Sequence, residues 1–305
     1  MSVTTLIATP AIIEKMEKFY ADYFVKTPAH ARFQAKIPGC TITAYHSNKV
    51  VFQGGSASKE AETWQAFTQP KSPTPVKKVK KAPIHFDQFD CIGCDESGVG
   101  DYFGPVTAAC IYIPKHDIPS LQTLGITDSK KMTDDRICEI APQLMKQFPY
   151  AITILPNPKY NQLQAQGING HMMKALLHNQ ALTKLFQEHD LHYDYIIMDQ
   201  FVNEQAYYRY FSRLQVEPIR GLTFLEKAES QSVAVAAASV LARYTYVKAM
   251  EKLASTLGRP LPKGASKAVD RFAAQLITEQ GLDCLDTYAK QHFVTTQKAI
   301  DLAKS

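Results

Sequence analysis

The chain has 305 residues, of which 45% are hydrophobic and 21% are charged, and its formal net charge is +5 at pH 7. This length suffices for two domains with buried cores. No apolar run approaches the roughly 18 residues of a membrane-spanning helix, so the composition excludes an integral membrane protein of the helical kind. The N-terminal segment has no basic leader ahead of its apolar residues, so we expect no signal peptide and a cytoplasmic protein.

The first 67 residues predict a small α+β domain. Residues 9–24, TPAIIEKMEKFYADYF, have the period of an amphipathic helix. The apolar stripe of this helix would consist of Ile12, Met16, Tyr20 and Phe24. Residues 39–55 alternate between apolar and polar side chains, which indicates two strands joined at Ser47 and Asn48, and residues 56–67 predict a closing helix.

A linker is predicted at residues 68–86, which combine proline and serine with five lysines and no acidic residue. The charge along the chain is uneven, because residues 1–67 carry a net charge of +2, the linker carries +5 and residues 87–305 carry −2. The excess positive charge suggests a module that binds a polyanion. A lysine-rich, solvated linker without a binding role is the alternative.

Residues 87–305 predict an α/β domain, because strands come first, strands and helices then alternate, and helices complete the chain. The predicted strands are residues 88–96, 104–114, 150–156 and 193–201, and the predicted helices are residues 134–148, 170–189, 230–254, 266–280 and 291–303. We therefore expect a mixed β-sheet with flanking helices and a helical C-terminal extension.

Six cysteines, at positions 40, 91, 94, 110, 138 and 284, show no disulfide framework and are expected to be free thiols in a reducing cytosol. Cys91 and Cys94 form a Cys-x-x-Cys pair, which could indicate zinc or redox chemistry. A zinc site would need a second pair or a histidine partner at suitable spacing, and a redox pair would begin a helix, whereas this pair lies in a predicted strand. We interpret the two cysteines as small buried side chains.

Carboxylates stand at the ends of two predicted strands. Asp95 and Glu96 close the first strand of the α/β domain, and Asp199 closes the strand at 193–201. Ligands of open α/β sheets bind at strand ends, although an Asx turn or a helix cap would explain each residue equally well. Glu229 precedes an alanine-rich helix, where a carboxylate also suits the helix dipole. If these acids converge, their repulsion calls for a divalent cation such as Mg²⁺ or Mn²⁺.

The segment DESGVGDYFGPV, residues 95–106, resembles the Asp-Glu-x-Gly-x-Gly-x-x-x-Gly-Pro signature of the type 2 ribonucleases H. Further segments resemble that family in the same order, namely residues 127–133 (TDSKKMT), 167–182 (GINGHMMKALLHNQAL), 195–201 (YIIMDQF) and 227–243 (KAESQSVAVAAASVLAR). The resemblance covers residues 90 to about 300. The small domain ahead of it, and Glu229 where the ribonuclease HII branch has aspartate, resemble the ribonuclease HIII branch.

This resemblance implies a ribonuclease H-like fold whose active-site carboxylates, which also bind the metal, are Asp95, Glu96, Asp199 and Glu229. It implies hydrolysis of the RNA strand of an RNA/DNA hybrid, with 5′-phosphate and 3′-hydroxyl products and two Mg²⁺ (or Mn²⁺) ions in the substrate complex. The N-terminal domain is similar to half of the TATA-binding protein and is implied to help hold the substrate. Residues 44–54, with Tyr45 and Lys49, carry that likeness.

The resemblance also implies which residues contact the substrate. Gly98, Val99 and Gly100 would bring backbone amides to the minor groove, where the 2′-hydroxyl distinguishes RNA from DNA. Val99 departs from the family, in which a basic residue is common between the two glycines. Ser129, Lys130 and Lys131 would contact phosphates, and a solvated turn is the alternative. Asp101, Asp128 and Glu226 are expected to be structural.

Two histidines on one predicted helix, His171 and His178, are seven residues apart, which is about 10 Å along a helix and too far for one ion. We expect them to pack or to face the substrate. Two alternatives to the main hypothesis stay open. One is a ribonuclease HII-like enzyme that incises at single ribonucleotides, and the other is a non-catalytic hybrid-binding protein. The four acids disfavour pure binding, because acids repel phosphates. A monomer is expected.

Overall fold

The computed structural model describes residues 2–65, 85–126 and 132–304. The chain separates into two compact units, Met1–Ile84 and His85–Ser305. Most of the predicted linker lies outside the described residues, so the domain boundaries assigned from the sequence stay a prediction.

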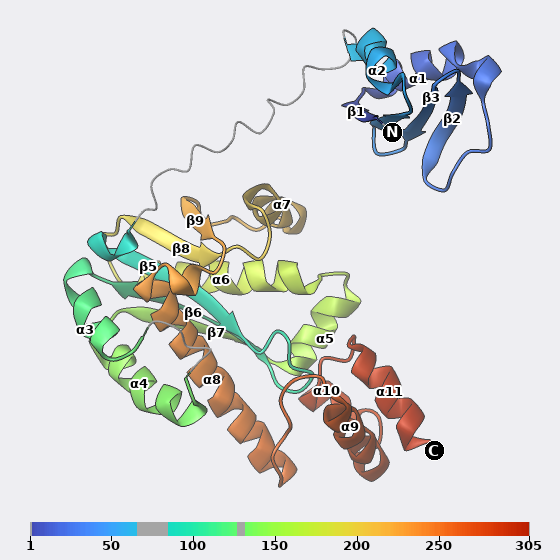
Figure 1. The fold of residues 1–305 in the computed structure, drawn as a ribbon. Coiled ribbons are helices and arrows are strands. Elements are labelled where there is room, and N and C mark those ends of the chain that lie inside the picture. Colours follow the sequence, from blue (N-terminus) through green and yellow to red (C-terminus); the bar gives the residue numbers. More distant parts are fainter. Residues whose placement is uncertain (1, 66–84, 127–131, 305) are drawn as a thin grey trace. The chain divides into compact units, whose positions relative to one another are not determined.

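The first unit is a four-stranded antiparallel sheet with two helices (Figure 1). Its elements are β1 (Val3–Ile7), α1 (Pro10–Phe19), β2 (Ala31–Ile37), β3 (Cys40–Tyr45), β4 (Lys49–Gln53) and α2 (Ala57–Gln65). The strand order is β1-β4-β3-β2. The two helices are tied by Tyr20, whose hydroxyl donates to Glu60 at 2.5 Å and accepts from the indole of Trp64 at 2.6 Å.

The predicted first helix is too long. Helix α1 ends at Phe19, and Ala21–Tyr23 form a 3₁₀ turn that changes the direction of the chain. Met16 and Tyr20 are buried as predicted, but Phe24 lies beyond the turn, is 44% exposed and forms a β-bridge with Ala35. Ile12 is only partly buried, and Ile13 takes the core position instead.

The second unit contains the predicted mixed sheet (Figure 1). Its strands are β5 (Cys91–Ser97), β6 (Val106–Ile113), β7 (Tyr150–Leu155), β8 (Tyr195–Asp199) and β9 (Leu222–Leu225), in the order β7-β6-β5-β8-β9. β5 pairs antiparallel with β6 and parallel with β8, and β9 is parallel to β8. The antiparallel β5–β6 hairpin and the parallel β8 and β9 make the sheet mixed.

Helices cover both faces of this sheet. On one face lie α3 (Ile118–Thr123), α4 (Asp134–Gln147) and α8 (Val233–Leu257), and on the other lie α6 (Gly170–Glu188) and α7 (Glu204–Leu214). A further cluster is built from α9 (Lys267–Gln280), α10 (Cys284–Tyr288) and α11 (Val294–Ala303), with α5 (Asn157–Ala165) beside α10. The central strand β5 therefore has a separate hydrophobic core on each side.

Helix α8 lies directly on the backbone of β5. A Cβ atom at Gly93 would stand 2.1 Å from the carbonyl carbon of Ala234 and 2.3 Å from the amide nitrogen of Val235. Both atoms belong to the backbone of α8, so no side chain can move aside. The glycine and the small residues of α8 together bring the helix close to the strand that carries Asp95 and Glu96.

Candidate active site

Three of the four predicted carboxylates line one hollow. The hollow has a volume of about 290 Å³ and is lined by Asp95, Glu96, Ser97, Gly98, Val99, Asp199, Ser239 and Arg243. Its position follows from the register of the parallel strands, in which Cys94 is paired with Met198. The residues that follow this pair, Asp95 and Asp199, therefore lie side by side near the ends of neighbouring strands, which are about 4.8 Å apart in a sheet.

Asp95 is partly buried beneath α8. One of its carboxylate oxygens accepts a hydrogen bond from the amide of Glu96 at 2.8 Å. Burial, followed by the negative charge of Glu96, raises the pKa of Asp95 above its ordinary value, although a hydrogen bond with Ser239 acts in the opposite direction. A cation in the hollow would favour the ionised form of this carboxylate.

Glu96 points to the opposite face of the sheet, since successive side chains of a strand alternate. There its two oxygens contact Lys174 Nζ and His178 Nε2, each at 2.8 Å. These two residues are four apart on α6 and so share one helix face. Burial raises the pKa of Glu96, but His178 and Lys174 outweigh that effect and hold the pKa below its ordinary value. Glu96 is therefore fixed as an oriented carboxylate.

Asp199 is held by the backbone of the chain that leads into α8. Its Oδ1 accepts a hydrogen bond from the amide of Ala228 at 3.0 Å. Ala228 begins a 3₁₀ turn, Ala228–Ser230, that contains Glu229. Glu229 is described by the structure but is not among the residues that line the hollow. The turn thus brings Glu229 near Asp199 in space, without adding it to the lining.

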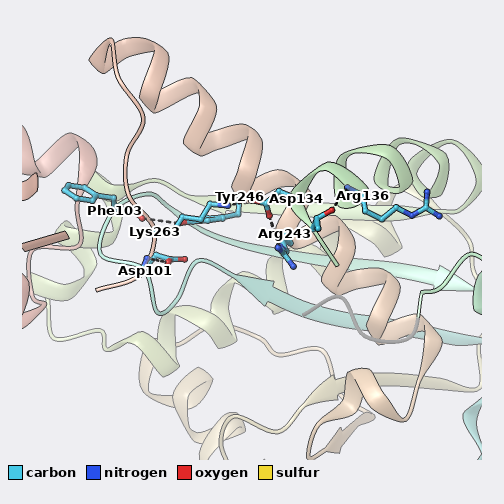
Figure 2. Close-up of polar contacts among 9 residues, drawn as sticks. Asp101, Phe103, Asp134, Arg136, Arg243, Tyr246 and Lys263 are labelled. Carbon is cyan, nitrogen blue, oxygen red and sulfur yellow. Dashed lines mark hydrogen bonds and ion pairs between the residues drawn. The ribbon is translucent and has the colours of Figure 1, made fainter. Parts of the chain in front are cut away.

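A basic edge adjoins the carboxylates. Arg243 of α8 lines the hollow, and its Nη2 and Nε atoms lie 2.8 Å and 3.1 Å from Oδ1 of Asp134, the first residue of α4 (Figure 2). Lys263 also forms an ion pair with Asp134. Asp134 therefore orients a guanidinium group at the hollow. Neither Arg243 nor Lys174 was predicted from the sequence, although both lie in segments that carry the family resemblance.

The predicted substrate residues differ in their surroundings. Gly98 is buried with φ +82°, and a Cβ there would stand 2.3 Å from the carbonyl oxygen of Pro105, so packing alone requires glycine. Val99 is partly buried against an apolar cluster, and Gly100 is exposed, with no atom within 4 Å of the place that a Cβ would take. In the first unit, Tyr45 ends β3 and Lys49 begins β4.

The structure describes some of the remaining predicted residues and not others. Ser129, Lys130 and Lys131, together with Asp128, lie outside the described residues. Asp101 accepts a hydrogen bond from the amide of Gly264, which agrees with its structural interpretation. His178 is fully buried and binds Glu96, whereas His171 stacks near Phe201 with ring centroids 6.1 Å apart.

Comparisons with known proteins agree with the sequence resemblance. The family model described as Ribonuclease HII matches residues 92–296, and a model described as a domain of unknown function (DUF3378) matches residues 4–78. Relatives named Ribonuclease HIII from Listeria monocytogenes and Bacillus cereus are 41% and 42% identical to the chain, with 100% of both sequences covered in each comparison. The chain belongs to the ribonuclease HIII family.

Solved structures of ribonuclease HIII and related enzymes show the same fold. Bst-RNase HIII in complex with Mn²⁺ is 39% identical, with a TM-score of 0.71 and 99% of both chains covered. The ribonuclease H2 of Pyrococcus horikoshii OT3 is 18% identical with a TM-score of 0.59 over 71% of this chain, and so it supports the fold alone. The predicted family, fold class and enzyme class, a ribonuclease H, are confirmed.

Proposed function

We propose that this member of the ribonuclease HIII family hydrolyses the RNA strand of RNA/DNA hybrids in the hollow at the ends of β5 and β8, leaving 5′-phosphate and 3′-hydroxyl ends. The observation that carries the proposal is the convergence of Asp95, Glu96 and Asp199 on one hollow beside Arg243. Full-length relatives named Ribonuclease HIII favour this activity over incision at single ribonucleotides and over hybrid binding without catalysis.

The donor set fits hard divalent cations. Carboxylate oxygens that face a solvent-accessible hollow suit Mg²⁺, with Mn²⁺ as the alternative, and the Mn²⁺ complex of Bst-RNase HIII supports this choice. Asp95, Glu96 and Asp199 would hold the ions, and Glu229 is proposed as a further ligand because it adjoins the Ala228 amide that binds Asp199. When bound, two ions supply Lewis-acid activation of the attacking water and stabilisation of the leaving 3′ oxygen.

The protein's own residues prepare the site for a phosphate. Lys174 and His178 hold Glu96 ionised and oriented, and the amide of Ala228 fixes Asp199. Arg243, oriented by Asp134, places a planar cation where it can contact a phosphate oxygen. Positioning and charge are thus the contributions of the chain to this chemistry.

The first unit and the linker are proposed to hold the hybrid. Residues 1–86 carry +7 of the net charge, whereas residues 87–305 carry −2 and must approach a polyanion. Lys49 is exposed and Tyr45 is half-buried, so both can reach a ligand. In the second unit, Gly100 is exposed and Gly98 and Val99 line the hollow, which supports their proposed contact with the minor groove.

The proposal also concerns the location and the oligomeric state of the enzyme. None of the helices in the described ranges is long and apolar enough to cross a membrane. A monomeric, cytoplasmic enzyme is the form that we infer, and this inference stays a prediction.

The proposal is tested with a labelled RNA/DNA hybrid in Mg²⁺. Asp95→Asn and Asp199→Asn each remove the charge of one proposed ligand, and we expect at least about a hundredfold loss of cleavage with little change in hybrid binding. Asp190→Asn, at an exposed position after α6, is the matched control and should cleave normally. Near-wild-type cleavage by either site variant would overturn the assignment, and efficient incision of a duplex with one embedded ribonucleotide would favour the ribonuclease HII-like alternative.

A further inference from the structure

Three side chains that can bind a metal lie together in the core next to Glu96. They are Cys94 on β5, Cys110 on β6 and His178 on α6. The potential ligand atoms all lie within 4.8 Å of one another, and the two sulfur atoms are 3.0 Å apart. All three residues are 0% exposed. This cluster is distinct from the solvent-accessible hollow and contains none of the proposed catalytic carboxylates.

The register of the sheet brings the two thiols together. Cys94 and Cys110 are directly opposite each other in the antiparallel pair of β5 and β6. Both belong to the hydrophobic core on the α6 side of the sheet, whereas Cys91 belongs to the core on the α8 side. Directly opposed residues have Cβ atoms about 4.5–5.5 Å apart, a separation that a metal ion bound to both sulfurs can bridge.

We propose that Cys94, Cys110 and His178 bind one thiophilic divalent ion, with Zn²⁺ as the ion expected in the cell. Two thiolates and an imidazole are preferred zinc ligands, whereas Mg²⁺ prefers oxygen. With Zn–S bonds of about 2.3 Å, the sulfurs of a tetrahedral site lie about 3.8 Å apart, so the thiols need to separate by less than about 1 Å. Two thiolates balance the charge of Zn²⁺, so the filled site buries no net charge.

An independent observation points to a missing ligand at this place. The Nδ1 atom of His178 is buried and has no hydrogen-bond partner of normal geometry among the described residues, although the Cys110 thiol faces the ring. The hydroxyl of Tyr207, in the same core, also lacks a partner within that part of the chain. Buried polar atoms are nearly always paired, and the Cys110 thiol, a weak hydrogen-bonding group, is the partner that faces this ring, so a metal ion on Nδ1 would give the atom a stronger partner.

The site would also act on Glu96. The imidazole of His178 presents Nδ1 to the thiols and Nε2 to Glu96 at 2.8 Å. A metal on Nδ1 requires the ring proton to be on Nε2, from which it is donated to the carboxylate, and such carboxylate–histidine–metal chains fix the orientation of both groups. This consequence for catalysis rests on the proposed function, but the binding of zinc does not. Cys94, Cys110 and His178 are positioning residues in this scheme.

The test measures metal in the full chain. The protein is expressed with added zinc, dialysed against a chelator that removes ions from the open hollow, and analysed by inductively coupled plasma mass spectrometry. In parallel, protein refolded with Co²⁺ is examined for the visible d–d bands of a tetrahedral thiolate site. Cys110→Ser and Cys94→Ser each remove one ligand, and Cys91→Ser, a buried thiol on the other face of β5, is the matched control. Circular dichroism verifies that each variant is folded.

We expect about one zinc per chain in the wild type and in Cys91→Ser, and a loss of at least about tenfold in Cys110→Ser and Cys94→Ser. Cobalt bands should appear in the wild type, a result that does not depend on any variant. The proposal is overturned if the wild type contains no zinc and shows no cobalt bands, or if Cys110→Ser retains zinc. A failure of the catalytic proposal would appear instead as normal cleavage by Asp95→Asn, with the zinc content unchanged.

Discussion

The contact between β5 and α8 predicts that Gly93→Ala is strongly destabilising. The added Cβ would stand 2.1 Å from the backbone of Ala234, whereas ordinary contacts begin at 3.4 Å, so the strand and the helix must separate by about 1.3 Å. Overpacking of a core costs about 1–3 kcal/mol, and we expect a loss of about 3 kcal/mol because both colliding elements are backbone. Alanine is more stable than glycine inside a strand, but this difference offsets less than about 1 kcal/mol of the overpacking cost.

The assay is urea unfolding of the full chain followed by far-ultraviolet circular dichroism. With a slope of about 3 kcal/mol/M, the midpoint of the second unit should fall by about 1 M. The sole tryptophan, Trp64, lies in the first unit, so its fluorescence transition should stay unchanged and serves as an internal control. Gly100→Ala, where no atom lies within 4 Å, is the matched variant and should stay within about 0.5 kcal/mol of the wild type. A Gly93→Ala protein as stable as Gly100→Ala would refute the proposed close contact.

Two further predictions concern Lys49 and Lys290. Lys49→Ala should weaken hybrid binding and reduce the slope of log K against log salt by about 0.9, measured by titration at several salt concentrations, while Lys59→Ala on α2 should leave the slope unchanged. Lys290 is fully buried, donates to the carbonyls of Asp101 and Gly104, and has its pKa lowered by burial to about 7. Between pH 7 and about 10.5 the unfolded chain binds this proton and the folded chain does not. The stability relative to Lys290→Met should therefore rise with pH, by on the order of 5 kcal/mol across the window. A pH-independent difference between the two proteins would contradict the assignment.

Strands and helices could be predicted where a run of consecutive residues has a clear hydrophobic pattern. The strand that carries Asp95 and Glu96 and the apolar strand that ends in Asp199 could be placed from the sequence, and the short signature that begins at Asp95 indicated the family. The roles of all four carboxylates stay predictions that the proposed variants test. Strands β1, β2 and the four-residue β9 were not predicted, because the stability of a strand comes largely from its neighbouring strands and not from its own sequence.

Contacts between distant segments could not be predicted in the same way. Lys174 and His178 are spaced four apart, which places them on one helix face, but only the packing of α6 on the sheet brings that face to Glu96. Cys94 was compared with Cys91 because they are close in sequence, whereas strand register pairs it with Cys110. Arg243 gave no signal of its own, since its partner Asp134 begins a helix 109 residues earlier.

The alternation of Asp95 and Glu96 along β5 turns two adjacent carboxylates toward helices on opposite faces of the sheet. Ser239 of α8 contacts Asp95, and Lys174 and His178 of α6 contact Glu96. The two carboxylates still affect each other, because the charge of Glu96 raises the pKa of Asp95 and the charge of His178 lowers it. Substitutions that repack the α6 core would therefore change the pKa of Asp95 as well, and directed evolution would have to adjust both ligands of this dipeptide together.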